Sequence, residues 1–391
     1  MSLLSLSIVI PVKNDSNSLF KVLSHIKNLY PEPKEIIIVD SSFDNSNQKI
    51  VENLKNTIPI TYHHVKQAYP GRARNIGVSL AKYDWIAFLD CKTQPYNKWL
   101  QRYTQFIETY NVDVVFGVTK FEAITTFQKN LRASSFGKIG HQTVPGTLVK
   151  KSVFYDSGGF IEDLRMGEDI EWRNRLNRHG YKVYKPVEPV LSYSGLSDNL
   201  CTTLKKYFFS SYHSARTDIQ LNIKEAYLSL ALILSAIILP KWNHLIDGWD
   251  SNLLFIPHIT KIYLIALVCL LLIYQLTRYL LFRNIPQTLF SRTLKIMVLI
   301  FITLTVYQWN AVIVGWMEDA VLYVPHITKV YVSGLVVTSI FYRGLALPLR
   351  REVEPGFLFP VRWIKVGLLG LLLDLIKAPA YVFGAIGAMF R

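Results

Sequence analysis

The sequence predicts an α/β domain followed by an α-helical membrane region. In the first 90 residues, short apolar runs typical of buried strands alternate with helical patterns, an order that favours a mostly parallel sheet. The second half holds apolar runs of about 20 residues, the length that a helix needs to cross a bilayer. Basic residues gather beside some of these runs, as they do at cytoplasmic membrane edges. We expect the first domain to cover 1–222 and the membrane region to begin at 223.

Four strands and three helices are expected in the first domain. Parallel sheets bind their ligands at the carboxyl ends of strands, and Asp40 and Asp90 each end an apolar run. Either carboxylate could bind a base or ribose, or hold a metal that neutralises a diphosphate. Either could instead cap the next helix. The expected strands are 5–12, 35–40, 58–64 and 85–90, and the expected helices are 18–29, 45–56 and 71–81.

An internal repeat organises the membrane region. Trp242-Asn243, Gly248-Trp249 and Pro257-His258-Ile259-Thr260-Lys261 recur in the same order as Trp309-Asn310, Gly315-Trp316 and Pro325-His326-Ile327-Thr328-Lys329. This pattern indicates a duplicated helix-turn-helix unit. We therefore expect about four transmembrane helices in 223–349, at 229–249, 262–282, 296–316 and 330–349.

The loop charges predict the orientation of these helices. Basic residues bracket the loop after the second span and the segment after the fourth, which places both in the cytoplasm together with the first domain. The final segment, 361–390, is apolar but carries four charges, so it is either a fifth span or, as we favour, a helix lying in the membrane interface. The basic residues are Arg278, Arg283, Arg292 and Lys295 for the loop, and Arg343, Arg350, Arg351, Arg362 and Lys365 for the segment.

Bulk composition excludes some classes of function. The net charge of +15 could suit nucleic acid, but no run of Lys and Arg is interleaved with aromatic residues. Membrane edges and an anionic substrate explain the charge better. Three scattered cysteines, Cys91, Cys201 and Cys269, support neither a disulfide framework nor a zinc site.

Six short motifs in order give the first domain a resemblance to a known family. They are Val9-Ile10-Pro11-Val12-Lys13-Asn14, Ile38-Val39-Asp40-Ser41-Ser42, Gly71-Arg72-Ala73-Arg74-Asn75-Ile76-Gly77, Phe88-Leu89-Asp90, Gly158-Gly159-Phe160 and Gly167-Glu168-Asp169. Residues 5–220 resemble family 2 glycosyltransferases with the Rossmann-like GT-A fold. The second half is similar to membrane-anchored, exopolysaccharide-type (ExoA-like) members.

The resemblance implies roles for individual residues. Asp169 would be the general base that takes the acceptor's proton. Asp40 would bind the base of a nucleotide-sugar, and Asp90, the first carboxylate of the family's Asp-x-Asp motif, would bind a divalent metal, Mg²⁺ or Mn²⁺. The other donor-binding residues would be Pro11, Lys13, Asn14, Arg74, Asn75 and Lys92, and the acceptor side would hold Gly158, Gly159, Phe160 and Glu168.

The sequence departs from the family pattern at two places. Lys92 replaces the second Asp of Asp-x-Asp, which leaves three readings: a metal held by Asp90 and the diphosphate, a metal-free site in which Lys92 offsets phosphate charge, or an inactive enzyme. The run 204–216 lacks the Gln-x-x-Arg-Trp motif of processive members, so we expect one sugar per cycle. Its basic and aromatic residues could meet a lipid diphosphate or simply anchor the domain.

Together these features predict an inverting glycosyltransferase of the inner cell membrane. It would move one sugar from a nucleotide-sugar to a lipid-linked acceptor on the cytoplasmic face, in polysaccharide or glycolipid assembly. Membrane lipids would be further partners. The alternative is an inactive nucleotide-sugar-binding or scaffold subunit of such an assembly complex.

Overall fold

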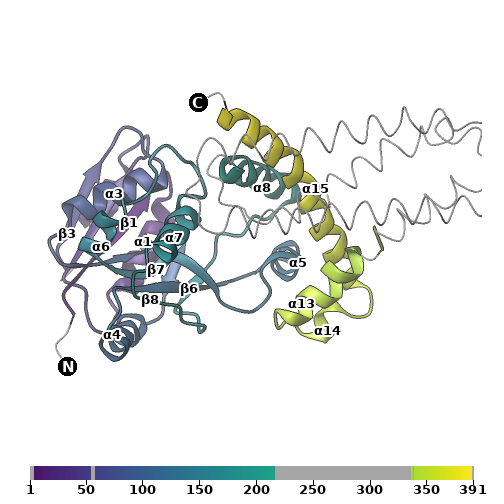
Figure 1. Ribbon diagram of the computed structural model, residues 1–391, viewed down its shortest axis with the longest axis horizontal. Coiled ribbons are helices and arrows are strands. Elements are labelled where there is room, and N and C mark those ends of the chain that lie inside the picture. Colours follow the sequence, from purple (N-terminus) through teal and green to yellow (C-terminus); the bar gives the residue numbers. More distant parts are fainter. Residues whose placement is uncertain (1–3, 54–57, 216–335, 338, 390–391) are drawn as a thin grey trace, which may run out of the picture.

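The computed structural model describes residues 4–53, 58–215, 336–337 and 339–389. Most of the predicted transmembrane region, 216–335, lies outside the described residues. The described part consists of a central sheet with helices on both faces and a group of C-terminal helices beside one end of it (Figure 1). The strands are β1 (Leu6–Val12), β2 (Glu35–Asp40), β3 (Ile60–His64), β4 (Trp85–Phe88), β5 (Thr93–Pro95), β6 (Val114–Phe121), β7 (His141–Lys150), β8 (Val183–Tyr184) and β9 (Leu191–Tyr193).

The sheet is mixed, with strand order β3-β2-β1-β4-β7-β6-β9-β5 and β8 paired to β6. Strands β1 to β4 are parallel to one another. Strand β7 runs antiparallel to both neighbours, β4 and β6. The predicted parallel strands are therefore confirmed as one half of the sheet. The strands of the antiparallel half show little alternation of apolar and polar residues, which is the pattern that predicts such strands.

Two apolar layers hold the sheet between its helices. Alternate residues of each strand face opposite sides: in β1, Ile8 and Ile10 pack with helices α1 and α4, whereas Val9 packs with α3, α6 and α7. These helices are α1 (Ser16–Ile26), α3 (Pro70–Leu80), α4 (Trp99–Tyr110), α6 (Lys151–Asp156) and α7 (Glu168–Arg178), and the short α2 (Ser46–Asn53) lies beside α1.

The helix bounds differ from the sequence prediction by a few residues. Helix α1 starts at Ser16 because Asp15 caps it, accepting a hydrogen bond from the Ser18 N–H at 3.3 Å. Helix α3 starts at Pro70. Proline is favoured at the first position of a helix because the backbone N–H that it lacks would have no hydrogen-bond partner within the helix.

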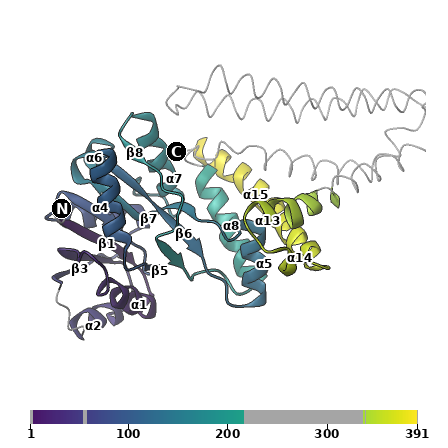
Figure 2. The same ribbon diagram turned by 90° about the horizontal axis from the view of Figure 1, so that it is seen from below.

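The C-terminal helices pack against one end of the domain. They are the π-helical turn η1 (Tyr342–Ala346), α13 (Leu347–Arg350), α14 (Pro355–Leu358) and the long α15 (Arg362–Met389), and they contact α5 (Thr126–Ser135) and α8 (Leu200–Ala215). Figures 1 and 2 both show α15 crossing α8 and passing close to α5. Gly384 makes the crossing close, because a Cβ there would lie 2.1 Å from the Tyr212 carbonyl oxygen.

No helix in the described part of the chain is both long enough and apolar enough to span a membrane. Of the four predicted spans, only 336–337 and 339–349 of the last fall among the described residues. Segment 361–390 is largely α15, in which buried Asp374 pairs with Arg343 and with Lys377.

Candidate active site

Arg74 on α3 joins two carboxylates from distant parts of the chain. Its Nη2 lies 2.8 Å from Asp90 Oδ1, just beyond β4, and its Nη1 lies 2.7 Å from Glu168 Oε1, at the start of α7. The Arg74 side chain is 4 % exposed. Burial by itself would lower the pKa of Arg74, but the charges of Asp90 and Glu168 outweigh it and raise the pKa. In this structure both terminal nitrogens of Arg74 hold protein carboxylates, and its binding of the donor stays a prediction.

The consecutive acids Glu168 and Asp169 have different surroundings. Glu168 is 5 % exposed, and its desolvation raises its pKa to about 7 against the opposing effect of Arg74. Its carboxylate is bound by Arg74, and its contact with an acceptor stays a prediction. Asp169 is partly exposed and makes no hydrogen bond or ion pair with the described residues. Asp169 is therefore the carboxylate that is available to a ligand.

Asn75 fixes the turn that precedes α7. Its side chain donates to the Phe160 carbonyl oxygen at 2.9 Å and accepts from the Phe160 N–H at 2.9 Å. Gly158 and Gly159 have φ of 79° and 60°, a region that favours glycine. The Phe160 ring is 2 % exposed and packs on Phe88 in the core. Asn75 and Phe160 therefore fix the backbone of this turn, and their contacts with donor and acceptor stay predictions.

Asp40 is wholly buried. One of its carboxylate oxygens accepts from the Ser42 N–H at 2.8 Å, and the other accepts from Asn47 Nδ2 at 3.1 Å and the Tyr62 hydroxyl at 2.6 Å. Desolvation and this bond to Asp40 raise the pKa of Tyr62. Through these bonds Asp40 holds the loop after β2, and its contact with a nucleotide base stays a prediction.

The loop after β1 lies against the loop after β2. Asn14, with φ of 48°, donates its N–H to Ser42 Oγ at 2.6 Å, and its side-chain oxygen accepts from the Phe43 N–H at 3.1 Å. Lys13 Nζ lies 5.4 Å from the centre of the Phe43 ring. Pro11 is partly buried in β1, while Lys13, Asn14 and Phe43 are exposed. The two loops thus present a cation and an aromatic ring to solvent.

Lys92 lies where the family pattern has its second carboxylate. Its Nζ is 3.3 Å from Asp15 Oδ2, and its side chain is 47 % exposed. Asp90 has one oxygen bound by Arg74. The described residues contain no group of three His, Cys, Asp or Glu side chains that could hold a metal ion. A divalent cation prefers several oxygen ligands, so an Asp90 shared with Arg74 and followed by Lys92 does not fit one.

Sequence reasoning did not single out three side chains near these acids. Lys206 on α8 places its Nζ 5.8 Å from the centre of the Tyr193 ring, which belongs to β9. Desolvation and the charge of Lys92 lower the pKa of Lys206. Arg173 lies near Asp169, whose charge opposes the lowering of the Arg173 pKa by burial. The only sequence signal was the basic and aromatic run that contains Lys206.

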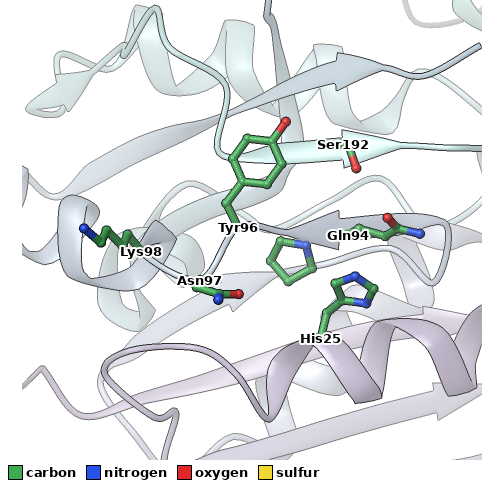
Figure 3. A pocket seen from close by; sticks show the side chains of 7 residues that line it. His25, Gln94, Tyr96, Asn97, Lys98 and Ser192 are labelled. Atoms are coloured by element: carbon green, nitrogen blue, oxygen red, sulfur yellow. The ribbon is translucent and has the colours of Figure 1, made fainter.

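A hollow of about 500 Å³ lies elsewhere, between α1 and the edge strand β5 (Figure 3). None of the predicted site residues lines it. Its lining residues are His25, Gln94, Pro95, Tyr96, Asn97, Lys98 and Ser192.

Comparisons with known proteins agree with this arrangement. The model of glycosyl transferase family 2 matches residues 7–167. Glycosyltransferase AglE of Haloferax volcanii is 26 % identical over 190 residues, which cover 45 % of this chain and 62 % of AglE. The pre-mycofactocin glycosyltransferase of Mycobacterium tuberculosis is 26 % identical over 198 residues, which cover 46 % of this chain and 41 % of that protein. The chain thus spans less than two thirds of either relative.

Similarity to solved structures is lower. S. aureus TarS 1–349 in complex with UDP-GlcNAc has a TM-score of 0.42 at 15 % identity, covering 56 % of this chain and 68 % of that one. Likeness of this degree does not bear on substrate. The match of the family model over residues 7–167, together with the similarity to these relatives, supports a family 2 glycosyltransferase domain in this part of the chain.

Proposed function

We propose that the protein is an inverting glycosyltransferase that moves one sugar from a nucleotide-sugar donor to a membrane-bound, lipid-linked acceptor. The observation that carries this proposal is Asp169, a partly exposed carboxylate without a partner among the described residues. Its neighbour Glu168 is tied through Arg74 to Asp90. A general base needs such an uncommitted carboxylate within hydrogen-bond reach of the acceptor hydroxyl.

The proposed chemistry is a single displacement. Asp169 removes the proton of the acceptor hydroxyl while the hydroxyl oxygen attacks the anomeric carbon, and the nucleoside diphosphate leaves from the opposite face. One displacement inverts the anomeric configuration. The buried Arg74 pair keeps the start of α7 beside the end of β4, which supports a shared site for donor and acceptor.

The nucleotide is proposed to lie over the loops after β1 and β2. Lys13, Asn14 and Phe43 are exposed there, and an ammonium group and an aromatic ring suit a nucleotide's phosphates and base. Asp40 supports this surface from beneath through Ser42.

The acceptor is proposed to be reached from the cytoplasmic face of the inner membrane. Val361, Ile364, Leu368 and Leu372 are all exposed at helical spacing along or just before α15. An exposed apolar stripe on a helix that also carries Arg362 and Lys365 suits the membrane interface. This supports the interfacial reading of 361–390, and the spans proposed within 223–349 would complete the anchor.

Asp169→Asn tests the enzymatic proposal. Purified protein is incubated with UDP- and GDP-sugars and a membrane lipid extract, and transfer and donor hydrolysis are measured. The wild type should turn over at least one donor, and Asp169→Asn should lose about a hundredfold or more of that rate. Asp156→Asn, which alters an exposed acid at the end of α6, is the control and should keep the rate.

Two results would count against the proposal. Nucleotide-sugar binding without turnover of any donor would favour the inactive or scaffold subunit. A product that keeps the donor's anomeric configuration, read from NMR coupling constants, would contradict the single displacement.

A further inference from the structure

Two lysines from separate parts of the chain come together beside Asp90. Lys92 follows β4, and its carbonyl oxygen accepts from the Ser194 N–H at 3.3 Å. The next residue, Thr93, pairs with Tyr193 across β5 and β9, and the Tyr193 ring lies 5.8 Å from Lys206 Nζ. Gly195 lets these groups approach, because a Cβ there would lie 2.4 Å from the Tyr193 hydroxyl and 2.8 Å from Lys92 Cδ.

Carboxylates of the described residues balance only part of the charge of this pair. Asp15 is the single carboxylate that forms an ion pair with Lys92 among the described residues. Lys206 has no carboxylate partner in the same part of the chain. Two neighbouring ammonium groups repel each other, and a bound anion relieves that repulsion. Lys92 and Lys206 therefore favour the binding of an anionic ligand with more than one charge.

The position of the pair indicates which anion. Lys92 occupies the sequence position of the second metal-binding carboxylate, and one oxygen of Asp90 accepts a hydrogen bond from Arg74. Resting on the proposed function, we propose that Lys92 and Lys206 bind the donor's diphosphate in place of a divalent cation. Lys206 thereby becomes a donor-binding residue contributed by α8, which lies outside the region matched by the family model.

The two cations also fit the electron flow of the transfer. The bond between the anomeric carbon and the diphosphate oxygen breaks, and its electron pair stays on that oxygen. The acceptor oxygen forms the new bond to the same carbon, and its proton passes to Asp169. Two ammonium groups on the leaving diphosphate stabilise the negative charge that develops there, which is the contribution otherwise expected from a metal.

Equilibrium binding to the full-length protein tests the proposal, with UDP, GDP, UMP and GMP as probes. Whichever nucleoside diphosphate binds should do so in EDTA with a Kd within about twofold of that in Mg²⁺ or Mn²⁺. Lys206→Gln should weaken that diphosphate about tenfold or more, the scale of a lost bond to a charged group. It should change the monophosphate by a smaller factor, and Lys206→Arg should restore most of the affinity.

Two further variants control the experiment. Lys205→Gln removes the exposed charge next along α8 and should leave the Kd unchanged. Lys92→Asp introduces the missing carboxylate and should make diphosphate binding depend on Mn²⁺.

The outcomes separate this inference from the proposed function. If the wild type binds a diphosphate only with metal, or if Lys206→Gln and Lys205→Gln behave alike, the lysine pair is wrong and the glycosyltransferase proposal stands. If no nucleotide binds under any condition, both are wrong.

Discussion

At the scale of single residues, Arg74 is the side chain on which the site depends most. It neutralises two carboxylates while being almost fully buried itself. Removing one partner from a buried charge network leaves uncompensated charge and costs about 3 kcal/mol or more. Arg74→Ala should therefore lower the free energy of unfolding by about 3 kcal/mol, measured by denaturant titration. Arg72→Ala is the control, because the side chains of Arg72 and Glu162 in its ion pair are each 55 % exposed. It should change the free energy of unfolding by less than about 0.5 kcal/mol. Equal losses in the two variants would contradict the stabilising role of Arg74.

Glu168 should make stability depend on pH. Its pKa is raised to about 7 in the folded protein, mainly by burial, from the ordinary 4.5. Between these values the folded state binds more protons than the unfolded state, so stability falls as the pH rises from 4.5 to 7. Wild type should lose roughly 2 kcal/mol relative to Glu168→Gln over that window, measured by denaturant titration at several pH values. A pH-independent difference would show that Glu168 stays ionised.

The sequence pointed to the acids of the candidate site but not to the residues that they contact in the structure. Asp40, Asp90 and Asp169 follow strands or start a helix, and such positions are visible in a local pattern. The partners of Arg74 lie 16 and 94 residues after it, and pairing over such a distance is not visible in a local sequence pattern. The burial of Asp40 by Tyr62 was hidden for the same reason.

At the scale of secondary structure, the crossing of α8 and α15 holds the C-terminal helices on the domain. Adding a Cβ at Gly384 would place it 2.1 Å from a backbone oxygen, where little can move. Gly384→Ala should lower the free energy of unfolding by about 1–3 kcal/mol and, because α8 carries Lys206, weaken binding of the nucleoside diphosphate. Gly356→Ala on α14, where a Cβ meets nothing within 4 Å, is the control, and the same loss there would refute the packing argument.

The elements that the sequence predicted are those whose packing produces a simple pattern of apolar residues in the sequence. Strands β1, β2 and β4 are short buried runs, and α1 and α3 have a buried face. Strand β7 contains Pro145 and Gly146, which argue against a central strand by local rules. Its neighbour β6 carries a bulge between Val115 and Gly117, where a Cβ would lie 2.0 Å from the Pro145 carbonyl oxygen, so close backbone contact overrides propensity there.

At the scale of the whole molecule, both ends of the segment 216–335 belong to one folded body. With the membrane anchor proposed above, the exposed Cys201 on α8 and the C-terminus should therefore lie on the same side of the membrane. In a variant with Cys91→Ser and Cys269→Ser, a membrane-impermeant maleimide should label Cys201 only in inverted vesicles. A C-terminal tag should be digested by protease in those vesicles alone. Opposite sidedness of the two probes would contradict the α8–α15 contact.

The α8–α15 contact also imposes a rule of parity. A chain that leaves a body on one side of a bilayer and returns to the same body must cross the bilayer an even number of times, whatever path it takes between. The four spans expected from the repeated helix-turn-helix unit obey this rule, and a fifth span formed by α15 would break it. Evolution could therefore add or remove the repeat only as a whole pair of helices without separating α15 from α8.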